Sequence, residues 1–80
     1  TIQSQSETFK RANALYKATN YEMAAKAYDS ILKFGLENAE VHYNLGNVYF
    51  KLEQLGLSIL HYEKALKFNP EDEDVLYNLK

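Results

Sequence analysis

Residues of the same type recur along this chain at one fixed interval. Leu45 recurs as Leu79, 34 positions later (79 − 45), and Tyr43 recurs as Tyr77 at the same distance. Seven further residues each have an identical residue one interval later: Asn13, Lys17, Tyr28, Leu32, Lys33, Phe34 and Glu37. A constant period of this length indicates an array of helical repeats, because one such repeat cannot bury its apolar face alone. The chain is therefore predicted to be a helical binding scaffold, and the period does not identify what is bound.

Length and charge limit the class of function. The 80 residues make one small domain, and 9 basic against 11 acidic residues leave a net charge of −2. This balance argues against nucleic acid, whose phosphates require a concentrated basic face. The absence of cysteine excludes a disulfide framework, and no apolar run approaches the ~20 residues of a membrane helix. Because the chain begins at Thr1 and ends inside an apolar pattern, we expect a piece of a longer protein.

Apolar residues at helical spacing predict two helices in the first half. Residues 1–5 carry no such pattern and are predicted to form a loose lead-in. Ser4 and Glu7 have the spacing of a capping box, although they could equally be polar linker residues. The first helix is predicted to end near residue 18. Asn20 is predicted to cap a second helix over residues 21–34, which Gly35 would close in the left-handed conformation.

The second half repeats this arrangement. Asn38 is predicted to cap a third helix that runs to about residue 52. A fourth helix is predicted over residues 55–68, where Asn69 and Pro70 stop it because proline cannot continue a helix. Asp72 is predicted to cap a fifth helix, over residues 73–80, which is too short to be stable without a neighbour. The short connections predict that successive helices are antiparallel.

Small residues recur where paired helices would approach most closely. Gly46 and Ser58 stand one period after Ala12 and Ala24. A glycine in a helix interior costs roughly 1 kcal/mol relative to alanine, so Gly46 needs a packing reason. Close packing of ridges into grooves provides one. The pattern therefore predicts tightly packed helical hairpins.

These residues resemble the tetratricopeptide repeat, whose pattern places Leu-Gly, an aromatic, alanine, a second aromatic, alanine and proline at the same spacing. The matching residues are Leu45, Gly46, Tyr49, Ser58, Tyr62, Ala65 and Pro70. The resemblance implies an all-α fold of antiparallel helix-turn-helix repeats in a right-handed α-solenoid. It implies one domain over residues 1–80, with repeats at 5–38 and 39–72 and a truncated third-repeat helix or cap at 73–80. Arg11 departs from a usual leucine, Leu36 from a proline and His42 from a tryptophan.

A narrower resemblance concerns the residue pattern of two stretches, residues 14–32 and 40–79. These look like the tetratricopeptide segment of the bacterial aerotolerance (Bat) operon proteins. That resemblance implies a cell-envelope or periplasmic protein, with a cleaved signal peptide before this segment and a membrane anchor after it. Without it, the expected compartment is the cytoplasm.

In this repeat family the first helix of each pair lines a concave groove that binds a partner. Carried over, the groove would present Phe9, Asn13, Tyr16, Lys17, Tyr43, Asn44, Asn47, Phe50, Lys51, Tyr77 and Asn78. Asparagine can pair with a peptide backbone in either direction, and aromatic rings supply rigid apolar area. The alternatives are that the aromatic residues stack between neighbouring helices and that the asparagines bond a neighbouring helix.

A chaperone-tail receptor is disfavoured among the possible groove proteins. That subfamily grips a terminal carboxylate with five residues, of which Asn13 and Asn44 match. Phe9 and Asp74 stand in place of two lysines, and Asn78 in place of an arginine. An acid at position 74 would repel a carboxylate.

Metal binding, cofactor binding and catalysis by this chain are not expected. His42 and His61 are the only histidines, fewer than the roughly four ligands of a zinc site. The acidic run at residues 71–74 lacks the glycine-punctuated loop of a calcium site, and no phosphate-binding glycine motif is present. We therefore expect neither metal, cofactor nor catalysis, and no direct membrane contact.

Three hypotheses follow for the function. The first is an interaction module that takes a peptide segment or helix of a partner protein in the groove. The second is self-assembly into a homo-oligomer through the fifth helix, which would expose Val75, Leu76 and Leu79. The third is a docking or regulatory domain of an enzyme whose catalytic part lies outside this chain.

Overall fold

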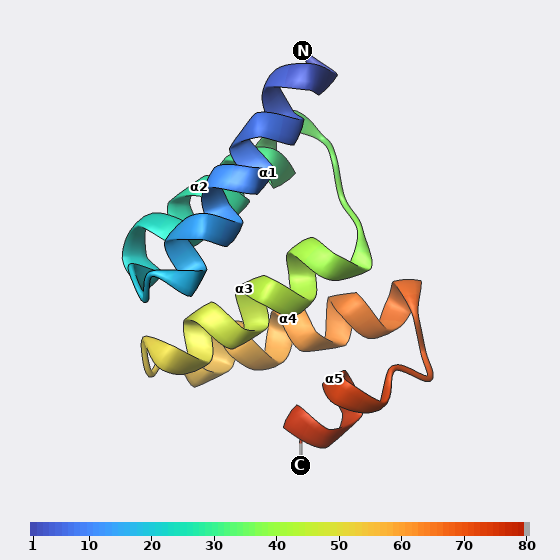
Figure 1. Ribbon diagram of the computed structural model, residues 1–80. Helices are drawn as coiled ribbons and strands as arrows, with labels where there is room; N and C mark the ends of the chain where they lie inside the picture. The colour runs from blue at the N-terminus through green and yellow to red at the C-terminus, as the bar shows by residue number, and fades with distance from the viewer. Residues whose placement is uncertain (80) are drawn as a thin grey trace. The chain divides into compact units, whose positions relative to one another are not determined.

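The computed structural model describes residues 1–79, the side chain of Ile2 excepted, so residue 80 of the predicted fifth helix lies outside the described residues. In this part of the chain the fold is all-helical, as predicted. The five helices are α1 (Ile2–Lys17), α2 (Tyr21–Phe34), α3 (Ala39–Lys51), α4 (Leu55–Phe68) and α5 (Glu73–Asn78) (Figure 1). None of them is both long and apolar enough to cross a membrane.

The helices gather into two compact units. Unit 1 is Thr1–Glu37 and unit 2 is Asn38–Lys80. In unit 1, α1 packs along α2, and in unit 2, α3 packs along α4 while α5 touches α4. The break between the units lies one residue before the predicted end of the first repeat. The single domain, the repeat boundaries and the right-handed solenoid stay predictions.

The start of α1 differs from the sequence prediction. The helix already begins at Ile2, and Thr1 is its N-cap, whose side chain accepts a hydrogen bond from the Ser4 backbone at 3.0 Å. The loose lead-in and the capping box at Ser4 and Glu7 are therefore wrong. Threonine is itself a favourable N-cap residue, so the helix starts before its apolar pattern does.

The other helix ends follow the predicted residues closely. Asn38 caps α3 by accepting from the Val41 backbone at 2.8 Å. Asp72 caps α5 by accepting from the backbone of Asp74 and Val75. Gly35 closes α2 at φ +100°, in the left-handed region. Asn20 occupies the N-cap position of α2 but makes no side-chain capping bond.

Two helix ends use the left-handed conformation without glycine. Thr19 has φ +62° after α1, and Glu53 has φ +61° after α3. The following residue closes each end, because Asn20 donates to the Leu15 carbonyl and Gln54 to the Tyr49 carbonyl, both at 2.9 Å. This is the Schellman closure of a helix. The two connections are equivalent, since positions 19 and 53 are one period apart.

The close approach predicted at Gly46 is confirmed in unit 2. Ser58 on α4 donates its hydroxyl to the Gly46 carbonyl on α3 at 2.7 Å. A Cβ atom on Gly46 would overlap the ring of Tyr62 on α4. Gly46 is therefore required where the two helices cross.

The fifth helix leans on its neighbour, as its short length requires. Val75 is fully buried against Tyr62 and Ala65 of α4, with Tyr43 and Leu79 partly buried around them. The expectation that Val75 is exposed is therefore wrong, because this side chain anchors α5. Leu76, on another side of the same helix, is exposed as expected.

Candidate functional site

The predicted groove residues of unit 1 all lie on α1, and three of them contact tyrosines of α2. Phe9 lies edge-on to Tyr28, with ring centroids 6.1 Å apart. The Tyr28 hydroxyl donates to Asn13 Oδ1 at 2.5 Å. Tyr16 contacts the ring of Tyr21, whereas Lys17 is exposed in the last turn. Phe9 and Asn13 are therefore joined through one buried tyrosine of α2.

Three of the unit 2 candidates gather in the same way around Tyr62. The Tyr62 hydroxyl donates to Asn47 Oδ1. Asn78 donates from Nδ2 to Asn47 Oδ1 at 3.3 Å and to the Tyr62 oxygen at 3.4 Å. The Tyr43 ring lies 6.1 Å from the Tyr62 ring. The asparagine of α3 is thus linked to the asparagine of α5.

Tyr28 and Tyr62 are the partners that the sequence analysis did not assign. Each follows its asparagine by 15 residues, and the asparagines and tyrosines recur together at one period. That shared recurrence is the signal that could have linked them. The two hydrogen bonds agree with the alternative that the asparagines bond a neighbouring helix.

A further candidate of unit 2, Phe50, meets Asn78 at a pocket of about 180 Å³. Phe50 and Asn78 line it together with Leu55, Ser58, Ile59, Tyr62 and Leu79. We call this cavity the unit 2 pocket. Leu55 and Ile59 on α4 were missed, because the family pattern directs attention to the first helix of each pair. Lys51 and Tyr77 are exposed and Asn44 is half-buried.

A buried histidine pair is the second feature that the sequence analysis missed. His42 Nδ1 and His61 Nδ1 lie 3.0 Å apart, and the two residues are only 1% and 7% exposed. Tyr49 stacks on His61 at 5.5 Å, and Phe68 stacks on His42 at 6.1 Å.

The position of this pair follows from the helix crossing. One helical turn away from the Gly46–Ser58 contact, an antiparallel pair of helices brings positions 42 and 61 together. The register of α3 against α4 at this crossing could therefore have predicted the histidine pair. Two imidazoles are too few for the roughly four ligands of a structural zinc site. No group of three or more metal-ligating side chains occurs within residues 1–79.

We predict that one imidazole of this pair donates a hydrogen bond through Nδ1 and that Nδ1 of the other imidazole accepts it. Because the two Nδ1 atoms face each other at hydrogen-bond distance, one must carry a proton and the other must accept. Long-range ¹⁵N NMR correlations should show one ring protonated at Nδ1 and the other bare at Nδ1.

The same chain unfolded in urea is the control, because both rings should then show the same average tautomer. Two bare Nδ1 atoms in the folded chain would contradict the hydrogen bond.

Comparison with known protein families gives a match to part of the chain. Residues 39–72 match the family described as tetratricopeptide repeat. No curated protein matches the chain, so no relative supports the narrower resemblance to the aerotolerance proteins. Repeats of this family are in general protein–protein interaction modules and are in general non-catalytic. The match therefore covers helices α3 and α4, the turn that joins them and the connection that follows.

Proposed function

We propose that the chain is a non-catalytic module that binds a peptide segment or helix of a partner protein. The unit 2 pocket would take one apolar side chain of that segment. The observation that carries this proposal is the position of Phe50, which is 55% exposed at the rim of a pocket beside Asn78.

The walls of the pocket favour an apolar side chain. Leu55 and Ile59 of α4 and Phe50 of α3 line the pocket, and each is about half-exposed. Apolar side chains that gather around a cavity mark a binding surface more often than single exposed ones do. Aromatic side chains such as that of Phe50 are enriched in the cores of protein interfaces.

The polar end of the pocket favours a peptide backbone. Asn78 uses Nδ2 in its two hydrogen bonds to Asn47 and Tyr62. Those bonds orient the amide, and Oδ1 can accept a hydrogen bond from a backbone N–H of the ligand. Asn47 and Tyr62 would then hold Asn78 in place rather than contact the ligand.

The other candidates take secondary roles in this proposal. Lys51 and Tyr77 are both exposed, and Lys51 would contact the segment beyond the pocket. Tyr43 and Asn44 are half-buried and would support the α3 surface. The candidates on α1 stay a prediction, since their contacts within unit 1 leave only Lys17 largely exposed.

The test is a peptide selected from a random display library on the unmodified chain. We expect Phe50→Ala to raise its dissociation constant at least about tenfold, and Asn78→Ala to raise it several-fold. The melting temperature should change little, because both side chains are exposed. Phe34→Ala is the matched control, since Phe34 is 49% exposed but lies on α2 in unit 1.

Titration calorimetry gives the dissociation constants, and NMR shift mapping gives the site. A selected peptide that binds the Phe50→Ala chain as tightly as the unmodified chain would contradict the proposal. So would a peptide whose shift changes cluster outside α3, α4 and α5.

A further inference from the structure

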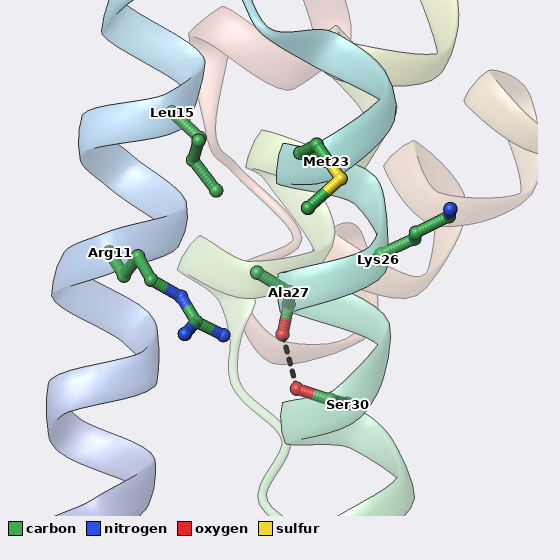
Figure 2. Close-up of a pocket in the computed structure, with 6 residues that line it drawn as sticks. All are labelled: Arg11, Leu15, Met23, Lys26, Ala27 and Ser30. Carbon is green, nitrogen blue, oxygen red and sulfur yellow. Dashed lines mark hydrogen bonds between the residues drawn. The ribbon is translucent and has the colours of Figure 1, made fainter.

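Unit 1 has a cleft that the proposed function does not use. It lies between α1 and α2, has a volume of about 300 Å³, and is lined by Arg11, Leu15, Met23, Lys26, Ala27 and Ser30. In Figure 2, Leu15 and Met23 extend toward each other from the two helices. Arg11 reaches from α1 toward α2, whereas the Lys26 amine points away from α1.

The chemistry of this cleft combines an apolar floor with a cation. Leu15 is half-buried and Met23 is half-exposed. A guanidinium presents a rigid fork of donors that matches a carboxylate. The cleft therefore fits a segment that carries one carboxylate beside one or two apolar side chains.

The outer face of α5 carries this combination. Glu73, Leu76 and Tyr77 occupy positions i, i+3 and i+4, so they share one side of the helix. Leu76 is 42% exposed and Tyr77 is 77% exposed, while Val75 on another side is buried. Glu71 and Asp74 add negative charge nearby. The exposed side of α5 is therefore an acidic, apolar surface.

We propose that the outer face of α5 in one copy of the chain docks into the α1–α2 cleft of a second copy. Glu73 pairs with Arg11, and Leu76 and Tyr77 cover Leu15 and Met23. The complementary charge and the matched apolar surfaces favour a second copy over an unrelated acidic partner. Because the donor and acceptor surfaces differ, the association is head-to-tail and can continue from copy to copy. A contact made of one ion pair and a few apolar side chains is small and therefore weak. We expect the association only at high protein concentration.

The first experiment is sedimentation velocity of the chain over a series of concentrations up to about 1 mM. We expect the average mass to rise with concentration and to fall again when salt is raised, because an exposed ion pair is screened. Arg11→Gln disables the cleft, and the double change Glu73→Gln plus Leu76→Gln disables the α5 face. Each variant alone should raise the dissociation constant at least about tenfold.

Mixing the two variants separates this proposal from other modes of association. The Arg11→Gln copy retains its α5 face and the other variant retains its cleft, so the mixture should form dimers and no larger species. Lys10→Gln and Glu63→Gln are the charge-matched controls, since both residues are exposed outside the two surfaces. Phe50→Ala should leave the association unchanged, which keeps this test independent of the peptide site.

Three results would overturn the proposal. The first is a strict monomer at every concentration. The second is association of the Arg11→Gln chain equal to that of the unmodified chain. The third is a mixture of the two disabled variants that forms no dimer, or that forms the same large species as the unmodified chain.

Discussion

Replacing Gly46 with leucine is expected to lower the free energy of unfolding by about 3 kcal/mol, through overpacking at the crossing of α3 and α4. The space that a side chain would occupy is filled by the ring of Tyr62. The neighbouring bond from Ser58 to the Gly46 carbonyl holds the helices at this distance. The side chain can therefore enter only if the helices separate and the buried Ser58 hydroxyl loses its acceptor. Urea unfolding followed by circular dichroism measures the change.

Gly56 is the matched control for this experiment. It also lies in a helix of unit 2, but no atom lies within 4 Å of the place where its Cβ would stand. Gly56→Leu should change the free energy of unfolding by less than about 1 kcal/mol. Alanine sharpens the comparison, because it is the better helix former by about 1 kcal/mol. Gly46→Ala should destabilise the chain despite that preference, while Gly56→Ala should not. Equal effects at the two glycines would contradict a close crossing at Gly46.

The crossing at Gly46 could be predicted because a small residue recurs there in both halves of the chain. The periodicity identifies the positions that repeat. A glycine inside a helix is unfavourable, so its presence indicates close packing at that position. The left-handed turns at Thr19 and Glu53 could not be found in this way, because neither residue is a glycine. The early start of α1 was missed for a similar reason. Its first turn has no apolar pattern, and a single cap residue, Thr1, decides where the helix begins.

The candidate site could be predicted only in part, because recurrence does not say why a residue recurs. Phe50 and Asn78 were expected in a binding groove and lie at one pocket. Leu55 and Ile59 line the same pocket but lie on the second helix of the repeat. They were not predicted, because the groove residues were taken from the first helix of each pair. The histidine pair required the register of α3 against α4, which becomes visible only when the contacts across the crossing are known.

Replacing Asn47 with alanine is expected to lower the free energy of unfolding by about 2 kcal/mol. The reason is that Tyr62 is almost fully buried and its hydroxyl donates to Asn47 Oδ1. The change also removes the acceptor that Asn78 uses at 3.3 Å. Asn13→Ala should have a similar effect in unit 1, where Tyr28 is fully buried and donates to Asn13. Lys51→Ala is the control, because Lys51 is an exposed groove candidate on the same helix as Asn47.

A double-mutant cycle separates this structural role from contact with a partner. If the hydrogen bond explains Asn47, Asn47→Ala should cost much less in a chain that already carries Tyr62→Phe, because no buried hydroxyl then loses its acceptor. Affinity for a selected peptide should fall in Asn47→Ala only as far as Asn78 loses its orientation. The opposite outcome would contradict the structural role of Asn47. Unchanged stability with lost binding would make Asn47 a ligand contact, and the recurrence of asparagine beside tyrosine would then reflect the partner rather than the packing of the helices.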